Sequence, residues 1–292
     1  MAGSCAGFCL VIVFWGIDCV ARTLAWVYSR VGDTAEVHAA VPKPASIAVP
    51  SPGRRRFIER TAIAFSATPF IGAAYVLLYG RLDIEVTRQR IRLRRLPKAF
   101  EGFRIAQLSD IDISPFMPAD QICRCVTITN QLKPDLIVMT RDFVAWDPAA
   151  QEEVVQALTD LRTPHGVFGC LGNHETLTKT EDSITRLFAA QGIRILRQEH
   201  APIRLGSDTL NLIGIDDSQP DLKAVEHLMM PDTVNILLLH DQEPDGFDRA
   251  VEIGIDLTLV GHTNGGQLSL EFLHRGLCLA RMETPCVSGW YE

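Results

Sequence analysis

Five short apolar runs in the last two-thirds of this 292-residue chain each end in a block of polar side chains. In open α/β sheets, the loops that follow the strands converge on one crevice at the carboxyl ends of those strands. We therefore expect the five blocks to meet at a single site. In chain order the blocks are LSDID (108–112), MTRD (139–142), LGNHE (171–175), LLLHD (237–241) and LVGHTNGGQ (259–267).

The apolar runs alternate with longer stretches whose apolar residues recur every three or four positions. Short runs rich in β-branched residues predict strands, whereas the longer spacing predicts helices. This alternation predicts an α/β fold. The expected strands cover residues 103–108, 136–139, 166–171, 210–215, 234–239, 257–260 and 267–272. The expected helices cover residues 119–131, 148–161, 180–191, 222–229 and 244–253.

Taken together, the polar blocks offer the nitrogen and oxygen donors that hold divalent metals in proteins. Alone, each block has a plainer explanation, since an isolated Asp-x-Asp commonly forms a turn. An Asp-x-Asp-x-Ser after a strand also resembles phosphatases of the haloacid dehalogenase type, but the other four blocks fit that family poorly. The candidate donors are Asp110, Asp112, Asp142, Asn173, His174, His240, His262 and Asn264.

In this order the blocks resemble the motifs of the calcineurin-like metallophosphoesterases, which read Asp-x-His, Gly-Asp, Gly-Asn-His-(Asp/Glu), His and Gly-His-x-His. The resemblance covers about residues 78–292 and is to the membrane-anchored bacterial branch of that family. It implies a four-layer αββα sandwich, in which two mixed sheets are flanked by helices. It also implies a hydrolase of phosphomonoester or phosphodiester bonds that uses two divalent ions of the Mn, Fe, Zn or Mg class.

The same resemblance assigns the donors to two metal positions. Two such metals lower the pKa of a shared water and clamp the phosphoryl oxygens during in-line attack. His174 corresponds to the residue that protonates or stabilises the leaving oxygen, a role that suits a group titrating near neutral pH. The first position, here named the intact site, comprises Asp142, Asn173, His240 and His262. The second, the altered site, comprises Asp110, Asp112, the bridging Asp142 and Asn264.

The chain departs from the family motifs at three positions. Asp112 and Asn264 stand where the family has histidines, which makes the altered site all-oxygen and weaker for Zn and Fe than for Mn, Mg or Ca. Arg141 stands where the family has glycine. Its guanidinium would compete with a dication or, alternatively, bind a substrate phosphate through two hydrogen bonds.

Two functions are compatible with these departures. The first is a membrane-anchored, metal-dependent phosphoesterase that acts on a phosphorylated small molecule or on a lipid-linked substrate, since an anchor would hold the cleft near the bilayer. The second is a catalytically lapsed relative that keeps the fold, the anchor and one metal site. Such a relative would act as a binding module or would be a decayed remnant.

Charge divides the chain into a basic N-terminal part and an acidic remainder. Residues 1–98 hold 14 Lys and Arg against 6 Asp and Glu, whereas residues 99–292 hold 14 against 29. A basic, apolar segment before an acidic domain indicates membrane attachment and makes nucleic acid an unsuitable partner.

Two apolar segments precede the expected domain over residues 81–292. Residues 1–30 include an apolar run interrupted by Asp18, so a first membrane helix competes with a signal-like or buried helix. Residues 31–60 are expected to form a linker that ends in a basic cluster at 54–60. Residues 61–80 carry no charge and match the hydrocarbon thickness of a bilayer, which predicts a membrane helix.

The basic cluster also bears on the orientation of the domain. Positive residues tend to stay in the cytoplasm, which would place the catalytic domain outside it. The same run resembles a twin-arginine export signal, although residues 81–98 are equally basic. Family members of this type continue beyond the stretch that resembles TPCVSGWYE, so a C-terminal truncation of the domain is a further expectation.

Membrane attachment is predicted to depend on residues 61–80. Deleting residues 1–53 should leave the protein in the membrane fraction, whereas deleting residues 1–81 should release it. The reason is that burying Asp18 in lipid costs roughly 3 kcal/mol, while the second segment is uncharged. Fractionation and immunoblotting measure the distribution of each variant. A chain without residues 1–81 that still sediments with membranes would contradict the prediction.

Overall fold

The computed structural model describes residues 84–140, 142–216, 223–239 and 244–261, with scattered positions between 53 and 72 and at 289 and 291. The chain divides into two compact units, Met1–Ala73 and Ala74–Glu292. In the first unit, the described residues from Gly53 to Gly72 are helical. Among all described residues, no helix has both the length and the apolar character needed to cross a membrane. The first expected membrane segment and parts of the second lie outside the described residues.

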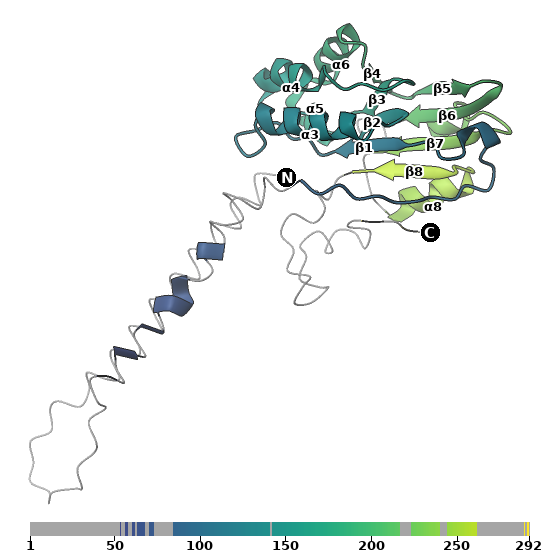
Figure 1. The fold of residues 1–292 in the computed structure, drawn as a ribbon. Coiled ribbons are helices and arrows are strands. Elements are labelled where there is room, and N and C mark those ends of the chain that lie inside the picture. Colours follow the sequence, from purple (N-terminus) through teal and green to yellow (C-terminus); the bar gives the residue numbers. More distant parts are fainter. Residues whose placement is uncertain are drawn as a thin grey trace, which may run out of the picture. The chain divides into compact units, whose positions relative to one another are not determined.

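The second unit contains two four-stranded sheets (Figure 1). All strands of the first sheet are parallel and lie in chain order. They are β1 (Ile105–Ser109), β2 (Leu136–Thr140), β3 (Val167–Cys170) and β4 (Arg194–Ile195). Because the strands are parallel, the loops after β1, β2 and β3 leave the sheet at the same edge.

The second sheet is mixed. It begins with an antiparallel hairpin of β5 and β6, after which β7 and β8 each run parallel to the preceding strand. Gly206, with a φ of 62°, adopts the left-handed backbone that the tight hairpin turn requires. The strands are β5 (Glu199–Leu205), β6 (Asp208–Gly214), β7 (Val234–Leu239) and β8 (Leu257–Val260).

Helices pack against the outer face of each sheet. Side chains of a strand alternate between faces, so Ile137 and Met139 of β2 pack under α3, α4 and α6, while Leu136 and Val138 point toward the second sheet. On β7, Leu237 and Leu239 face α7 and α8. The helices are α3 (Ala119–Gln131), α4 (Gln151–Leu158), α5 (Asn173–Thr178), α6 (Glu181–Ala190), α7 (Lys223–Glu226) and α8 (Pro244–Glu252), with short 3-10 turns η2 (Lys98–Phe100) and η3 (Pro148–Ala150).

The prediction of an α/β fold with two sheets is confirmed. Sequence periodicity predicted the bounds of α3, β7 and β8 as the structure has them, but it missed β4, β5 and α5. Strand β5 contains Pro202 and, among the described strands, lies at the edge of its sheet, which is where a sheet tolerates proline. The strand expected at 267–272 lies outside the described residues.

Candidate metal centre

The first three polar blocks meet at the carboxyl edge of the first sheet. The loops after β1 and β2 stay paired beyond the strands, because the Asp112 amide donates to the Asp142 carbonyl at 2.7 Å. Ile113 and Val144 then form a parallel bridge. Helix α5 begins at Asn173, three residues after β3 ends. Three segments distant in sequence are thus fixed side by side.

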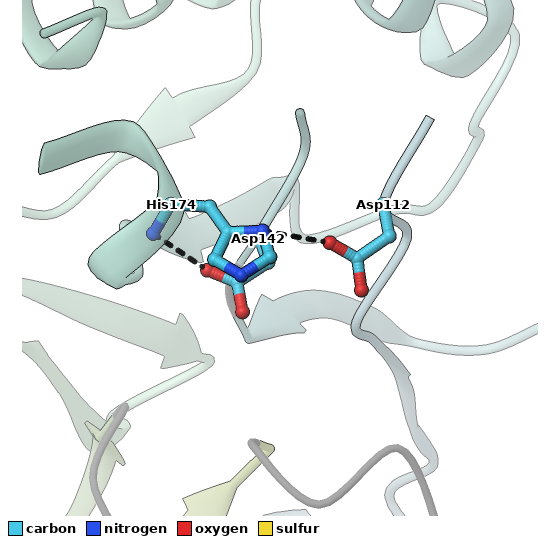
Figure 2. Close-up of side chains that lie close together, drawn as sticks. All are labelled: Asp112, Asp142 and His174. Carbon is cyan, nitrogen blue, oxygen red and sulfur yellow. Dashed lines mark hydrogen bonds and ion pairs between the residues drawn. The ribbon is translucent and has the colours of Figure 1, made fainter. Parts of the chain in front are cut away.

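Asp112, Asp142 and His174 form a compact cluster at this edge (Figure 2). One ligand atom from each lies within 4.8 Å of the others. His174 Nδ1 is 3.1 Å from Asp112 Oδ1, and the His174 backbone amide donates to Asp142 Oδ1 at 3.2 Å. Asp142 is buried, with 4% of its surface exposed, while the other two residues are half-buried.

The three aspartates of the first two blocks adopt an uncommon backbone conformation. The φ angles are 53° at Asp110, 46° at Asp112 and 39° at Asp142. Left-handed backbone costs an L-residue roughly 1–2 kcal/mol, although aspartate tolerates it better than most. Strained residues of this kind concentrate at functional sites. The strain therefore lies on the expected ligands themselves.

The Glu175 side chain joins the loop that carries Asp142 to the segment that carries His174. Its side chain is fully buried and accepts hydrogen bonds from the amides of Phe143 at 2.8 Å, Val144 at 3.2 Å and Gly172 at 2.9 Å. The first two amides follow Asp142, and the third precedes α5. Glu175 thus clasps the segment that carries Asp142 to the segment that carries His174.

Two groups near this clasp have shifted pKa values. The close approach of Asp112, followed by Asp142 and Glu175, raises the pKa of His174 to about 9 against the opposing effect of burial. Burial, with a further contribution from Asp142, raises the pKa of Glu175 to about 7, although its three amide donors oppose that rise. The charge of Asp142 thus contributes to both pKa shifts.

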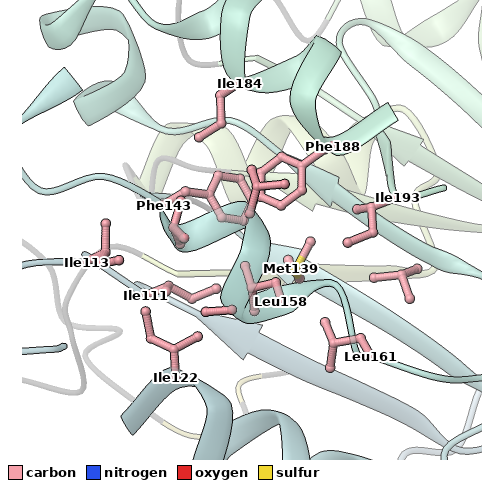
Figure 3. Close-up of a cluster of buried hydrophobic side chains, with 14 of the residues drawn as sticks. Ile111, Ile113, Ile122, Met139, Phe143, Leu158, Leu161, Ile184, Phe188 and Ile193 are labelled. Atoms are coloured by element: carbon pink, nitrogen blue, oxygen red, sulfur yellow. The ribbon is translucent and has the colours of Figure 1, made fainter. Parts of the chain in front are cut away.

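A hydrophobic cluster beneath the loops holds them in place (Figure 3). Ile111 and Ile113, which flank Asp112, and Phe143, which follows Asp142, are all buried in it. The rings of Phe143 and Phe188 of α6 have centroids 4.6 Å apart. Packed side chains thus anchor the loop after β1 on both sides of Asp112 and the loop after β2 directly after Asp142.

The donors present fit a divalent cation. Asp112 Oδ1 and His174 Nδ1 are buried and, despite their proximity, have no hydrogen-bond partner of suitable geometry among the described residues. With Asp142 they make a set of two carboxylates and one imidazole, which suits ions of the Mn, Fe or Zn class. This cluster differs from the all-oxygen altered site expected from the sequence, because it also contains His174, which the resemblance assigns to the leaving oxygen rather than to a metal.

The remaining expected site residues are placed only in part. Asp110 follows β1 directly and accepts a hydrogen bond from the Ser109 hydroxyl at 2.6 Å, and it is not a member of the cluster. Asn173 begins α5. Arg141, His240, His262 and Asn264 lie outside the described residues, as does any contact they make.

Gln107 links the second sheet to this edge, a role that the sequence analysis missed. Its side-chain amide donates to the Thr140 hydroxyl at 2.9 Å and to the Val260 carbonyl at 2.9 Å. Val260 is the last residue of β8, two positions before His262. The end of β8 therefore lies beside the ends of β1 and β2. A glutamine in a strand gives no sequence signal for such a contact, since its partners are distant in the chain.

Known proteins that are similar in sequence to this chain are named as metallophosphoesterases or as a phosphodiesterase. An uncharacterized metallophosphoesterase of Aquifex aeolicus is 31% identical over 200 residues, which are 65% of this chain and 74% of the relative. The phosphodiesterase YaeI of Escherichia coli is 27% identical over 226 residues, 75% of this chain and 80% of that protein. A transmembrane protein with metallophosphoesterase domain of Danio rerio is 27% identical over 72% of this chain, which spans about half (51%) of the relative. No family model matches the chain.

The cluster predicts that metal binding stabilises the protein through Asp142. Adding Mn²⁺ should raise the melting temperature of the wild type, because the ion binds only the folded site. The Asp142→Asn variant should lose most of that shift, since it removes a carboxylate ligand. Asp160→Asn, which changes an exposed aspartate that pairs with the exposed Arg162, is the control and should keep the shift. An equal shift in all three proteins would show that the ion binds elsewhere.

Proposed function

Because this chain belongs to the calcineurin-like metallophosphoesterase superfamily, we propose that it hydrolyses phosphomonoester or phosphodiester bonds through a centre of two divalent metals. The observation that carries the proposal is the cluster of Asp112, Asp142 and His174 at the carboxyl edge of the first sheet. Parallel strands place substrate sites at this edge. The relatives named metallophosphoesterase and phosphodiesterase support the same chemistry.

We propose that Asp142 bridges the two ions. Asp112 and Asp110 would hold the ion of the altered site, with Asn264 completing it. Asn173, His240 and His262 would hold the ion of the intact site. The contact between Gln107 and Val260 supports this arrangement, because it brings the end of β8 to the same edge. Bound metals would supply an activated water and neutralise charge on the phosphoryl oxygens.

The protein's own residues would orient the substrate and move one proton. His174 directs Nδ1 toward Asp112, which leaves Nε2 to give its proton to the leaving oxygen. Asp112 Oδ1 lies 3.1 Å from Nδ1 of this imidazole. Glu175 would fix the distance between His174 and Asp142 through the amides it binds. Arg141 would compete with the metals, the alternative being contact with a substrate phosphate through two hydrogen bonds.

We further propose that the protein is membrane-anchored, with its catalytic domain outside the cytoplasm and a lipid-linked phosphoester as substrate. The basic cluster and the apolar residues 61–80 support the anchor and its orientation. The Danio rerio relative that is named a transmembrane protein supports membrane association. The three departures from the family motifs favour a second candidate, in which the chain binds metal and ligand without turnover.

Hydrolysis of bis(p-nitrophenyl) phosphate tests the proposal directly. The full chain in detergent, supplied with Mn²⁺, should release p-nitrophenolate, and EDTA should abolish the release. On a dialkyl phosphodiester, whose alkoxide leaving group needs a proton, His174→Asn should lower kcat by at least about 100-fold, as loss of a general acid does; the loss on bis(p-nitrophenyl) phosphate should be much smaller, and bound metal should be unchanged. A wild type that binds metal but does not turn over would support the lapsed relative instead. Loss of metal in His174→Asn would make His174 a ligand.

Restoring the family residues should raise the rate. The triple variant Asp112→His, Arg141→Gly and Asn264→His would supply the altered site with two imidazoles and remove a competing cation. We expect the rate to rise by at least about 100-fold, the scale of regaining a metal-activated nucleophile. The check is the rate per metal-loaded protein. An unchanged rate in a folded variant with two bound metals would show that these residues do not limit activity.

A further inference from the structure

Large apolar side chains are exposed at few places in the described part of the second unit. The exposed fractions are 62% for Phe116, 60% for Trp146, 61% for Leu177, 75% for Val251 and 48% for Tyr291. The first three lie on the three segments that carry the metal cluster. Phe116 follows Asp112 by four residues, Trp146 follows Asp142 by four, and Leu177 follows His174 by three. We name these three side chains the apolar rim.

Local structure holds each rim residue outward. Phe116 lies at the tip of a tight turn closed by two backbone hydrogen bonds between Ser114 and Met117, at 3.2 and 3.0 Å. Trp146 lies two residues after the Val144 bridge and directly before Asp147, whose side chain accepts from the Ala149 amide at 2.9 Å. These side chains are therefore presented by ordered backbone.

The rim residues share one edge of the sheet. The bridge between Ile113 and Val144 joins the loop of Phe116 to the loop of Trp146. Residues three apart on a helix lie on the same side, so Leu177 lies one turn from His174 along α5. The Glu175 clasp holds α5 against the loop after β2. The apolar rim therefore lies on the same three segments, at the same edge of the first sheet, as the metal cluster.

The chemistry of the rim fits a lipid surface. Tryptophan, together with aliphatic and aromatic side chains, is typical of residues that enter the boundary between headgroups and acyl chains. Residues 99–292 carry 15 more acidic than basic side chains, so charge would not attract this domain to an anionic bilayer. Apolar contact is the attraction available to it.

We propose that Phe116, Trp146 and Leu177 enter the bilayer surface and present the metal cluster to the phosphoester of an amphiphilic lipid. The inference rests on the proposed function, since the cleft must hydrolyse such an ester. The acyl part of the substrate would stay in the bilayer while its headgroup reaches Asp142 and His174. Residues 61–80, which are uncharged and expected to form a membrane helix, would keep this chain attached to a bilayer.

Two substrates that share one scissile bond test the inference on the full chain. The p-nitrophenyl phosphodiester of dioleoylglycerol in mixed micelles carries acyl chains, whereas methyl p-nitrophenyl phosphate is soluble. Replacing all three rim residues by serine should lower the rate on the lipid diester by at least about 100-fold and the rate on the soluble diester by less than about threefold. Val251→Ser, at an exposed apolar position of α8, is the matched control and should change neither rate.

An equal loss on both substrates, or an unchanged rate on the lipid diester, would overturn the inference. A dimer that dissociates on the triple substitution would assign the rim to a second copy instead.

Tryptophan quenching by vesicles of brominated phosphatidylcholine separates docking from catalysis. Trp146→Phe should remove part of the quenching of the reconstituted chain. If neither substrate is hydrolysed but Trp146→Phe still reduces the quenching, the proposed function fails and docking holds. If the chain hydrolyses substrate but Trp146→Phe leaves the quenching unchanged, docking fails.

Discussion

The buried carboxylate of Glu175 is the contact on which the geometry of the site depends. A charged or protonated carboxyl group in an apolar interior is costly unless its hydrogen-bonding capacity is used. Here the amides of Phe143, Val144 and Gly172 use it. Because those amides adjoin Asp142 and precede α5, the clasp that relieves the burial cost also sets where the expected ligands lie.

The rest of the site follows from the parallel arrangement of β1, β2 and β3. It brings three loops to one edge, where strand-like pairing continues through Asp112 and Ile113. The hydrophobic cluster beneath them fixes Ile111, Ile113 and Phe143, so the intervening aspartates can adopt left-handed backbone without releasing the loops. Packing therefore supports the strain at the expected ligands, and the apolar rim is carried by the same loops and by α5.

Sequence reasoning succeeded where the signal is local. The periodic apolar residues of α3 and the continuous apolar run of β7 fixed those elements, and the polar blocks were placed correctly after β1, β2 and β3. It failed where a residue's role depends on distant partners. No role was assigned to Glu175 from the sequence, because its partners Phe143 and Val144 lie more than 30 positions away. Helix α5 has only six residues, and Glu175 itself caps it. The approach of His174 to Asp112 likewise joins segments that follow different strands.

The central claim is that the edge holding Asp112, Asp142 and His174 is a metal centre. Anomalous diffraction from crystals of the full chain grown with Mn²⁺ tests it most directly, since the signal locates the ion independently of activity. The account predicts an anomalous peak within coordination distance of the Asp142 carboxylate, with Asp112 as a second ligand. A fully Mn²⁺-loaded crystal whose anomalous peaks all lie away from Asp142 would contradict it.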